Sequence, residues 1–450
     1  MTMWLGYFEN AKKRLFDDKK NNESYRSVFQ MDYDRIVFSS AFRRLQNKTQ
    51  VLPFPKSDYV RNRLTHSLET ASVGRSIGNI VGEKIIAKYP DLVSKLQIYA
   101  TDFGHLVSAA CLTHDIGNPP FGHAGEAAIS SYFKSENAID LIKNLTDKQK
   151  ADLQNFEGNA SGLRIISQTL ENQSEIKGGL RLTLGTYATF AKYPKESLPN
   201  RKVEKQASLK KFGIYQSEID LFENEIAKPL HLISQKAYND RAWKRFPLTF
   251  LVEAADDICY HIIDFEDGFN VGFIDFYTLE TAFSELIDWK AQYEQRYQKI
   301  ISQREKANYL RSLSINQLVQ QTAQIFVDNE ADFLSGKLDK ALLDLLPMDK
   351  QKKLKRIIDI SIDKIYQSEP VLKIEAAGMK VLPDLLNKFV QATLFPKQYR
   401  IFYKLLPQEY KNGSNDYEKI LNVAMFVSNM TDRQAVELYK NINGIVLAGY

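Results

Sequence analysis

Apolar residues recur at spacings of three and four through most of this 450-residue chain, and this helical periodicity restricts the fold more than any other feature. The segment Arg61 to Ala87 reads as one long amphipathic helix. Leu106 to Leu112 is almost wholly apolar and predicts a buried helix, which the cluster from Gly117 to Pro120 would end. Pro247 to Glu266 predicts another long, largely buried helix. The same spacing favours helices at residues 338–346, 354–365, 381–395 and 431–442.

Strand signals are few, so the predicted fold class is all-α, with at most a minor β element. Leu and Thr alternate from Gly179 to Phe190, which fits a short strand or an extended loop. Lys192 to Lys211 is rich in Lys, Pro and Ser and reads as an exposed loop. We expect a helical body over residues 1–290 and a C-terminal helical region over 291–450 packed on it.

Composition excludes several classes of protein. The 60 basic and 55 acidic residues leave a net charge of +5, which does not by itself predict nucleic-acid binding. Two cysteines, both in apolar helix-like segments, do not suggest a disulfide framework. No run approaches the roughly 18 apolar residues of a membrane span, and the N-terminus lacks the pattern of a secretion signal. The expectation is a soluble, cytoplasmic protein without membrane partners.

Four side chains with metal-ligating chemistry stand out. His66 lies on the first long helix, and His114 with Asp115 ends the buried one. Burying a carboxylate without a partner costs several kcal/mol, so Asp115 needs a cation, a metal or strong donors. Asp256 shares one helix face with Tyr260, four residues on, and with Asp264, four further. A lone buried histidine is usually structural, but these groups together predict a metal site.

Two imidazoles and two carboxylates form a mixed nitrogen and oxygen donor set. It suits Mn, Fe, Co, Ni, Zn or Mg and lacks the thiolates of a closed structural zinc site. One such divalent ion polarises phosphoryl oxygens and lowers the pKa of bound water. Metal-assisted hydrolysis is therefore the predicted chemistry, with the identity of the ion left open.

The spaced His66, His114-Asp115 and Asp256 resemble the H…HD…D ligand set of the HD superfamily of phosphohydrolases. The flanking segments are similar to the deoxyguanosinetriphosphate triphosphohydrolase (dGTPase) branch of that superfamily. These segments are Phe42 to Val51, Arg61 to Ser67, His114 to Glu126, Phe156 to Ala160 and Asp256 to Asp267, with a weaker match at Met430 to Tyr439. The resemblance makes residues 1–290 an HD phosphohydrolase catalytic domain.

The resemblance implies hydrolysis of a deoxynucleoside triphosphate (dNTP), dGTP in particular, to a deoxynucleoside and intact tripolyphosphate. Attack would fall on the α-phosphorus, with the 5′ oxygen as the leaving group. His123 and Glu126 match the catalytic pair of the family. We expect His123 to act as general acid to the leaving oxygen or as base to the attacking water. Glu126 would orient its ring and raise its pKa.

The resemblance also implies substrate contacts. Arg63 lies one helical turn before His66 and would reach a phosphate oxygen. Asp264 with Gln50 would bind the 3′-hydroxyl, and Tyr260 would exclude a 2′-hydroxyl. Asn159 and the neighbours Lys192 and Tyr193 are weaker pocket or phosphate candidates. Asp257 is out of phase with Tyr260, and the remaining histidines are expected to be structural or on the surface, namely His105, His231 and His261.

Two alternatives stay open from the sequence. The first keeps the fold and changes the substrate: an HD phosphodiesterase, a nucleotidase or a guanosine tetraphosphate hydrolase. The second is a non-catalytic nucleotide sensor. The resemblance further implies a homo-oligomer, either a hexamer or a tetramer, and leaves open a dNTP activator, single-stranded DNA binding and the residues that read the base.

Overall fold

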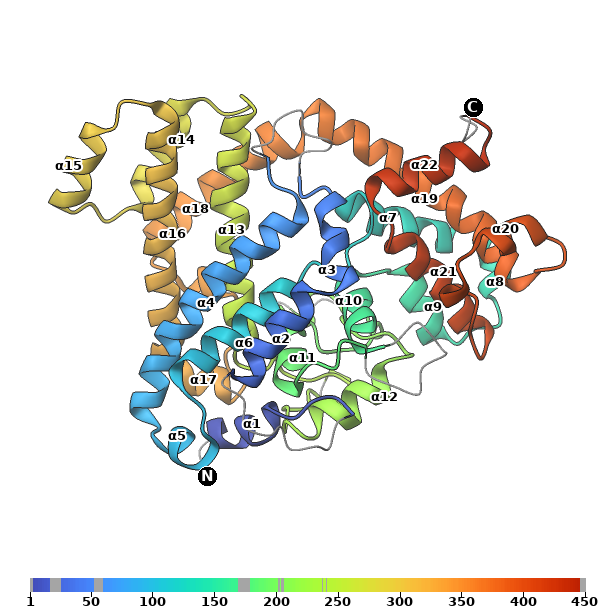
Figure 1. The fold of residues 1–450 in the computed structure, drawn as a ribbon, viewed down its shortest axis with the longest axis horizontal. Coiled ribbons are helices and arrows are strands. Elements are labelled where there is room, and N and C mark those ends of the chain that lie inside the picture. Colours follow the sequence, from blue (N-terminus) through green and yellow to red (C-terminus); the bar gives the residue numbers. More distant parts are fainter. Residues whose placement is uncertain are drawn as a thin grey trace.

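The fold is described from a computed structural model that covers residues 3–16, 26–51, 60–168, 179–200, 203, 206–236, 238–239 and 241–445. Over these residues the chain forms 22 α-helices and no sheet (Figure 1). The prediction of an all-α fold is confirmed. The β element amounts to isolated bridges between single residues, such as the one that joins Thr49 to Asn62.

The first half of the chain contains α1 (Met3–Ala11), α2 (Val28–Val37), α3 (Ser40–Arg44), α4 (Arg63–Lys88), α5 (Asp91–Leu96), α6 (Ala100–Thr113), α7 (Gly122–Lys134), α8 (Glu136–Ile142), α9 (Asp147–Gln154), α10 (Gly158–Ser167), α11 (Leu184–Phe190) and α12 (Ile219–Leu221). The second half contains α13 (Thr249–Asn270), α14 (Phe276–Leu286), α15 (Ala291–Lys299), α16 (Gln303–Asp328), α17 (Glu330–Leu334), α18 (Met348–Ser361), α19 (Glu369–Leu394), α20 (Arg400–Leu405), α21 (Asp416–Ser428) and α22 (Asp432–Ile442). Short 3-10 segments lie at Leu45–Asn47, Ala207–Leu209, Leu342–Leu345 and Gln408–Tyr410, and π-helical turns at Phe222–Ala227 and Ile362–Tyr366.

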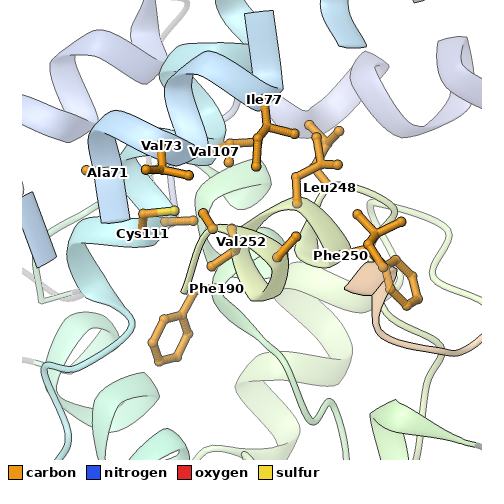
Figure 2. Close-up of a cluster of buried hydrophobic side chains, with 14 of the residues drawn as sticks. Ala71, Val73, Ile77, Val107, Cys111, Phe190, Leu248, Phe250 and Val252 are labelled. Carbon is orange, nitrogen blue, oxygen red and sulfur yellow. The ribbon is translucent and has the colours of Figure 1, made fainter. Parts of the chain in front are cut away.

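Helices α4, α6 and α13 form the centre of the molecule, with α2, α11 and α16 packed around them (Figure 1). Glycines at every fourth position of α4 let α6 approach closely. A Cβ on Gly78 would lie 2.8 Å from the Cα of Gly104 on α6, and one on Gly74 would lie 2.6 Å from the Sγ of Cys111. Figure 2 shows the apolar side chains of α4, α6 and α13 meeting in this core. The predicted helices at 61–87, 106–112 and 247–266 are therefore confirmed.

A second hydrophobic core joins distant parts of the chain. Most of its apolar residues come from α7 to α9 and from α19, α21 and α22. The orange and red helices α19 to α22 lie beside α7, α8 and α9 at one end of the molecule (Figure 1). Helices α14, α16 and α18 pack instead against α4 and α13 in the first core. Residues after 290 thus contribute to both cores, and the division at 290 stays a prediction.

Three predictions about local structure were wrong in the described residues. Part of the segment expected as a strand or loop is the buried helix α11, because Thr183 caps its first turn and accepts a hydrogen bond from the Thr186 amide. The expected exposed loop at 192–211 is irregular but largely buried, with Glu196 completely enclosed. Residues 338–346 form only a short 3-10 segment, Leu342–Leu345, rather than an α-helix.

The remaining C-terminal segments are helical as predicted: α18 and the π-helical turn Ile362–Tyr366 together cover 354–365, α19 covers 381–394, and α22 covers 432–442. Among the helices of the described ranges, none combines the length and hydropathy needed to cross a bilayer.

Candidate metal centre and substrate cavity

Three of the predicted ligands come from three different central helices and meet at one point. His66 lies on α4, His114 follows the last residue of α6, and Asp256 lies on α13. The Nε2 atoms of His66 and His114 lie 3.2 and 3.3 Å from Oδ1 of Asp256. One potential ligand atom from each residue falls within 4.8 Å of the others. A single ion can therefore contact all three side chains.

Local structure orients the two imidazoles. Asn62 caps α4 through a reciprocal capping box with Thr65, which places His66 in the first turn of the helix. His114 is the C-cap of α6, and its Nδ1 lies 2.6 Å from the carbonyl oxygen of Cys111. A ring nitrogen that donates to a carbonyl leaves the other nitrogen as the free acceptor, which is the usual arrangement of a metal-ligating histidine. Nε2 of His114 thus faces the centre.

Asp115 lies at the edge of this cluster and is almost completely buried. Its Oδ1 forms an ion pair with Arg63, at 2.9 Å, and accepts a hydrogen bond from Asn118. Its Oδ2 has no hydrogen-bond partner among the described residues, and neither does Nε2 of His114. Buried polar atoms are rarely left unpaired, and nitrogen and oxygen donors suit divalent ions. These side chains therefore fit a divalent metal ion, with Asp115 as the predicted fourth ligand.

The charges around the cluster favour ionised carboxylates. Burial would raise the pKa of Asp115, but the Arg63 guanidinium and the two imidazoles outweigh it and lower that pKa. Burial opposes ionisation of Asp256 as well, and the Lys192 ammonium, 2.6 Å from its Oδ2, holds its pKa well below the usual range. Both carboxylates are thus anionic at neutral pH, as their predicted role at a divalent ion requires. Lys192 contacts a predicted ligand in addition to lining the cavity.

His123 and Glu126 form a hydrogen-bonded pair beside the cluster. His123 lies in the first turn of α7, and its side chain is 88% exposed. Its Nδ1 is 2.8 Å from Oε2 of Glu126, whose Oε1 accepts a hydrogen bond from the Gly158 amide at the start of α10. The hydrogen bond to Glu126 raises the pKa of His123. The ring is thus held by a carboxylate and is free to meet a substrate.

These groups face one cavity of about 690 Å³, a volume within the usual range for small-molecule sites. Residues from the sequence predictions that line it are Gln50, Arg63, His66, His114, Asp115, His123, Glu126, Asn159, Lys192, Tyr193, Asp256 and Tyr260. The side-chain oxygen of Gln50 is buried and has no hydrogen-bond partner in the described chain. Asn159 donates to Glu157 at 2.7 Å.

Asp264 does not line this cavity, unlike the other predicted substrate residues. It is 1% exposed, and its Oδ2 accepts a hydrogen bond from the Tyr366 hydroxyl at 3.2 Å. The Tyr366 ring in turn stacks on Tyr260, with 5.5 Å between ring centroids. Contact between Asp264 and a sugar hydroxyl therefore stays a prediction, and it requires a path past Tyr366.

Sequence reasoning missed one wall of the cavity. Residues of the C-terminal half complete it: Ala341, Leu343, Asp344, Tyr366, Val371, Ile374 and Glu375. No local motif marks these positions, because they come from loops and helix faces that only the tertiary fold brings to the site. His261 also lines the cavity, whereas it had been expected to be structural or on the surface. Burial lowers its pKa to about 4.

Comparison with known proteins agrees with this geometry. Residues 63–182 match the HD domain family. A deoxyguanosinetriphosphate triphosphohydrolase-like protein of Synechocystis sp. is 43% identical over 454 aligned residues, which cover 97% of this chain and 98% of the relative. A protein of the same name from Pseudomonas aeruginosa is 37% identical and covers 94% of this chain and 95% of its own length. The chain belongs to the dGTPase-like family of HD-domain proteins.

The dGTPase-like family includes a more distant relative in Yersinia enterocolitica, named deoxyguanosinetriphosphate triphosphohydrolase, which is 28% identical over 92% of this chain and 93% of its own length. The HD match includes His66, His114 and Asp115 but ends before Asp256. The fold brings Asp256 to the other residues from α13. An HD domain implies a divalent metal ion, and this dGTPase-like chain is accordingly an HD-domain hydrolase with a His66, His114 and Asp256 donor cluster.

Proposed function

We propose that the chain is a metal-dependent dNTP triphosphohydrolase, which hydrolyses dGTP and related dNTPs at the α-phosphorus to a deoxynucleoside and tripolyphosphate. The observation that carries this proposal is the convergence of two sets of groups on one cavity. The donor cluster of His66, His114 and Asp256 lines the same 690 Å³ cavity as the hydrogen-bonded pair His123 and Glu126. The names of the relatives in Synechocystis sp. and Yersinia enterocolitica support the choice of substrate.

Four cationic side chains give the cavity affinity for a triphosphate. Arg63, Lys192, Lys210 and Lys211 all line it, and charge-assisted hydrogen bonds to phosphate oxygens are among the strongest in proteins. A divalent ion held by His66, His114, Asp115 and Asp256 supplies electrostatic polarisation of a phosphoryl oxygen when bound. The position of Arg63, bonded to Asp115, supports a role in orienting the α-phosphate next to these ligands.

His123 is the proposed general acid. The hydrogen bond to Glu126 raises the pKa of His123, which favours the protonated imidazole that can deliver a proton to the departing 5′ oxygen. Glu126 holds Nδ1, so Nε2 is the atom that reaches the leaving group. Because the products are a neutral deoxynucleoside alcohol and a highly charged tripolyphosphate, protonation of the leaving oxygen is the step that most needs a donor.

Selection of the deoxy sugar is proposed for Tyr260 and Gln50. The stacked rings of Tyr260 and Tyr366 form a flat wall in the cavity, and such a wall leaves little room for a 2′-hydroxyl. The unpaired oxygen of Gln50 offers an acceptor for the 3′-hydroxyl. An unfilled buried acceptor of this kind favours a ligand that brings a donor.

Product analysis tests the proposal. Purified protein with Mn²⁺ or Mg²⁺ is incubated with each of the four dNTPs, singly and in mixtures, and the products are separated by anion exchange. Release of tripolyphosphate and deoxyguanosine from dGTP is the expected result. Orthophosphate or pyrophosphate would instead identify an HD phosphodiesterase or nucleotidase, and binding without turnover would identify a nucleotide sensor. Activity that appears only in dNTP mixtures would reveal an activator.

Two adjacent carboxylates provide a matched test of the ligand set. Asp256→Asn should lose both bound Mn²⁺ and activity, because Asp256 lies within 3.3 Å of both imidazoles. Asp257→Asn should retain stoichiometric Mn²⁺, since Asp257 lines the cavity but is not part of the donor cluster. The reverse pattern would move the ligand to Asp257.

We further propose a homo-oligomeric assembly, a hexamer or a tetramer, on the strength of membership in the dGTPase-like family. Light scattering coupled to size exclusion measures it directly. A monomer of 51.7 kDa at micromolar concentration would contradict this proposal. Single-stranded DNA binding is checked in the same preparation by fluorescence anisotropy of a labelled oligonucleotide.

A further inference from the structure

One carboxylate near the C-terminus bonds to two backbone amides at the cavity. Asp432, in the first turn of α22, is 1% exposed. Its Oδ2 accepts a hydrogen bond from the Thr49 amide at 2.9 Å, and its Oδ1 accepts one from the Phe121 amide at 3.0 Å. The partners lie 383 and 311 residues away in the sequence. A single side chain thus joins two segments that are distant along the chain.

Neither Thr49 nor Phe121 lies inside a helix: Thr49 follows the 3-10 segment Leu45–Asn47, and Phe121 is the N-cap of α7. Thr49 lies in an isolated bridge with Asn62, directly before Gln50. Phe121 has left-handed backbone angles, with φ of 64° and ψ of 17°, and Gly122 after it also has a positive φ. A left-handed conformation is costly for a residue with a large side chain and persists only where its surroundings impose it. The bond from Asp432 supplies one such restraint.

Neighbouring groups reinforce the same junction. The buried Lys48 ammonium donates to the carbonyl oxygens of Asn118, at 2.5 Å, and Ser428, at 2.8 Å. The Phe121 ring packs against Gly378 of α19, where an added Cβ would lie 2.9 Å from the ring. Lys48 and Asp432 thus connect the end of α21 and the start of α22 to both segments. Asp432 also lies in the first turn of α22, where the positive end of the helix dipole attracts a carboxylate.

We propose, on the basis of the proposed function, that Asp432 is a positioning residue. Its bond to the Thr49 amide aligns Gln50 on the sugar side of the cavity, and its bond to the Phe121 amide aligns His123 on the leaving-group side. Each target residue lies one or two positions after the amide that Asp432 holds. Loss of either bond lets a segment shift, and catalysis is sensitive to displacements on the order of 1 Å. Asp432 itself does not line the cavity.

Two acid-to-amide substitutions on the same helix form a matched test. Asp432→Asn keeps the size of the side chain but places an NH₂ group where a backbone amide needs an acceptor. Glu437→Gln changes an exposed residue of α22 that pairs with the exposed Arg433. Hydrogen exchange of peptides containing Thr49 and Phe121 should accelerate in Asp432→Asn and stay unchanged in Glu437→Gln. This measurement does not depend on the reaction, so it separates failure of the inference from failure of the proposed function.

The kinetic arm uses dGTP and its 2′,3′-dideoxy analogue. Asp432→Asn should lower kcat/KM for dGTP by about 10- to 100-fold, with Mn²⁺ stoichiometry unchanged. The loss should be smaller for the dideoxy analogue, because it has no 3′-hydroxyl for Gln50 to bind. Equal losses on both substrates, wild-type exchange at both amides, or faster exchange spread over the whole chain would each overturn the positioning role.

Discussion

Replacing Gly117 by alanine should weaken metal binding and stability together, although Gly117 is not a predicted ligand. This glycine follows Asp115 by two residues, and the first turn of α10 lies against it. An added Cβ would lie 1.8 Å from the carbonyl oxygen of Gly158 and 2.1 Å from the Gly162 amide nitrogen. Non-bonded atoms of this kind do not approach within 3.0 Å, so the two backbones must separate by about 1.2 Å.

That displacement affects both sets of groups at the cavity. Metal–ligand distances tolerate roughly 0.2 Å, and the turn that moves carries Asp115. The other side of the contact is α10, whose Gly158 amide holds Glu126 at 2.8 Å. Overpacking of this severity costs about 1–3 kcal/mol of unfolding free energy, and disturbed support of metal ligands lowers metal affinity about 10- to 100-fold.

Titration calorimetry of metal-stripped protein with Mn²⁺ and thermal unfolding without metal measure the two effects. The control is Gly6→Ala, since Gly6 lies on α1 with nothing within 4 Å of an added Cβ. It should stabilise the protein by about 0.5–1 kcal/mol, as alanine does for a glycine inside a helix, and leave the Mn²⁺ affinity unchanged. A Gly117→Ala protein with wild-type affinity and stability would refute the reasoning.

Three further predictions concern single side chains. His123→Asn should lower kcat by about 10²- to 10⁴-fold with normal Mn²⁺ content, whereas substitution of the exposed His231 by Asn serves as a control without effect. Because Glu126 raises the pKa of His123, wild-type kcat should fall as pH rises through that pKa, and Glu126→Gln should move this fall to lower pH. An unmoved pH profile in Glu126→Gln contradicts the role of the pair. Burial raises the pKa of Asp152 from 3.8 to about 7, so the unfolded chain releases this proton first, and the unfolding free energy should decline by roughly 4 kcal/mol as the pH rises between these values. Urea unfolding of Asp152→Asn at pH 4 and pH 8 should lack this decline, and an identical decline in both proteins would disprove it. Tyr260→Ala should reduce the preference for dGTP over GTP at least about tenfold in kcat/KM, and unchanged discrimination would remove Tyr260 from sugar selection.

The spacing of apolar residues alone was sufficient to predict the central helices, because α4, α6 and α13 bury long apolar faces whose spacing is visible in the sequence. It failed where tertiary contacts decide the backbone. The alternation of Leu and Thr before Phe190 suggested extended structure, but the buried Asp32 carboxylate binds the amide of Thr183 and the hydroxyls of Thr183 and Thr186. These bonds fix the turn from which α11 starts.

The same contrast holds at the site. The cluster of His66, His114 and Asp256 was predictable. These polar side chains lie on apolar helices or directly after one, and buried polar groups of this kind need a partner such as a metal ion. The loop around Glu196 read as exposed, yet its carboxylate is enclosed by Lys148, Gln216 and Asn239 from three separate segments. The C-terminal wall also depends on tertiary contacts, and the two bonds of Asp432 span more than 300 residues. No local pattern in the sequence reveals either.

The fate of the oxygen from water tests the central claim most directly. With dGTP and Mn²⁺ in ¹⁸O-labelled water, attack at the α-phosphorus with departure of the 5′ oxygen places the label in a terminal phosphate of tripolyphosphate. Phosphorus-31 NMR detects it as an isotope shift of that resonance. The account predicts labelled tripolyphosphate and unlabelled deoxyguanosine. Label in orthophosphate, in pyrophosphate or in the 5′-hydroxyl of deoxyguanosine would contradict it.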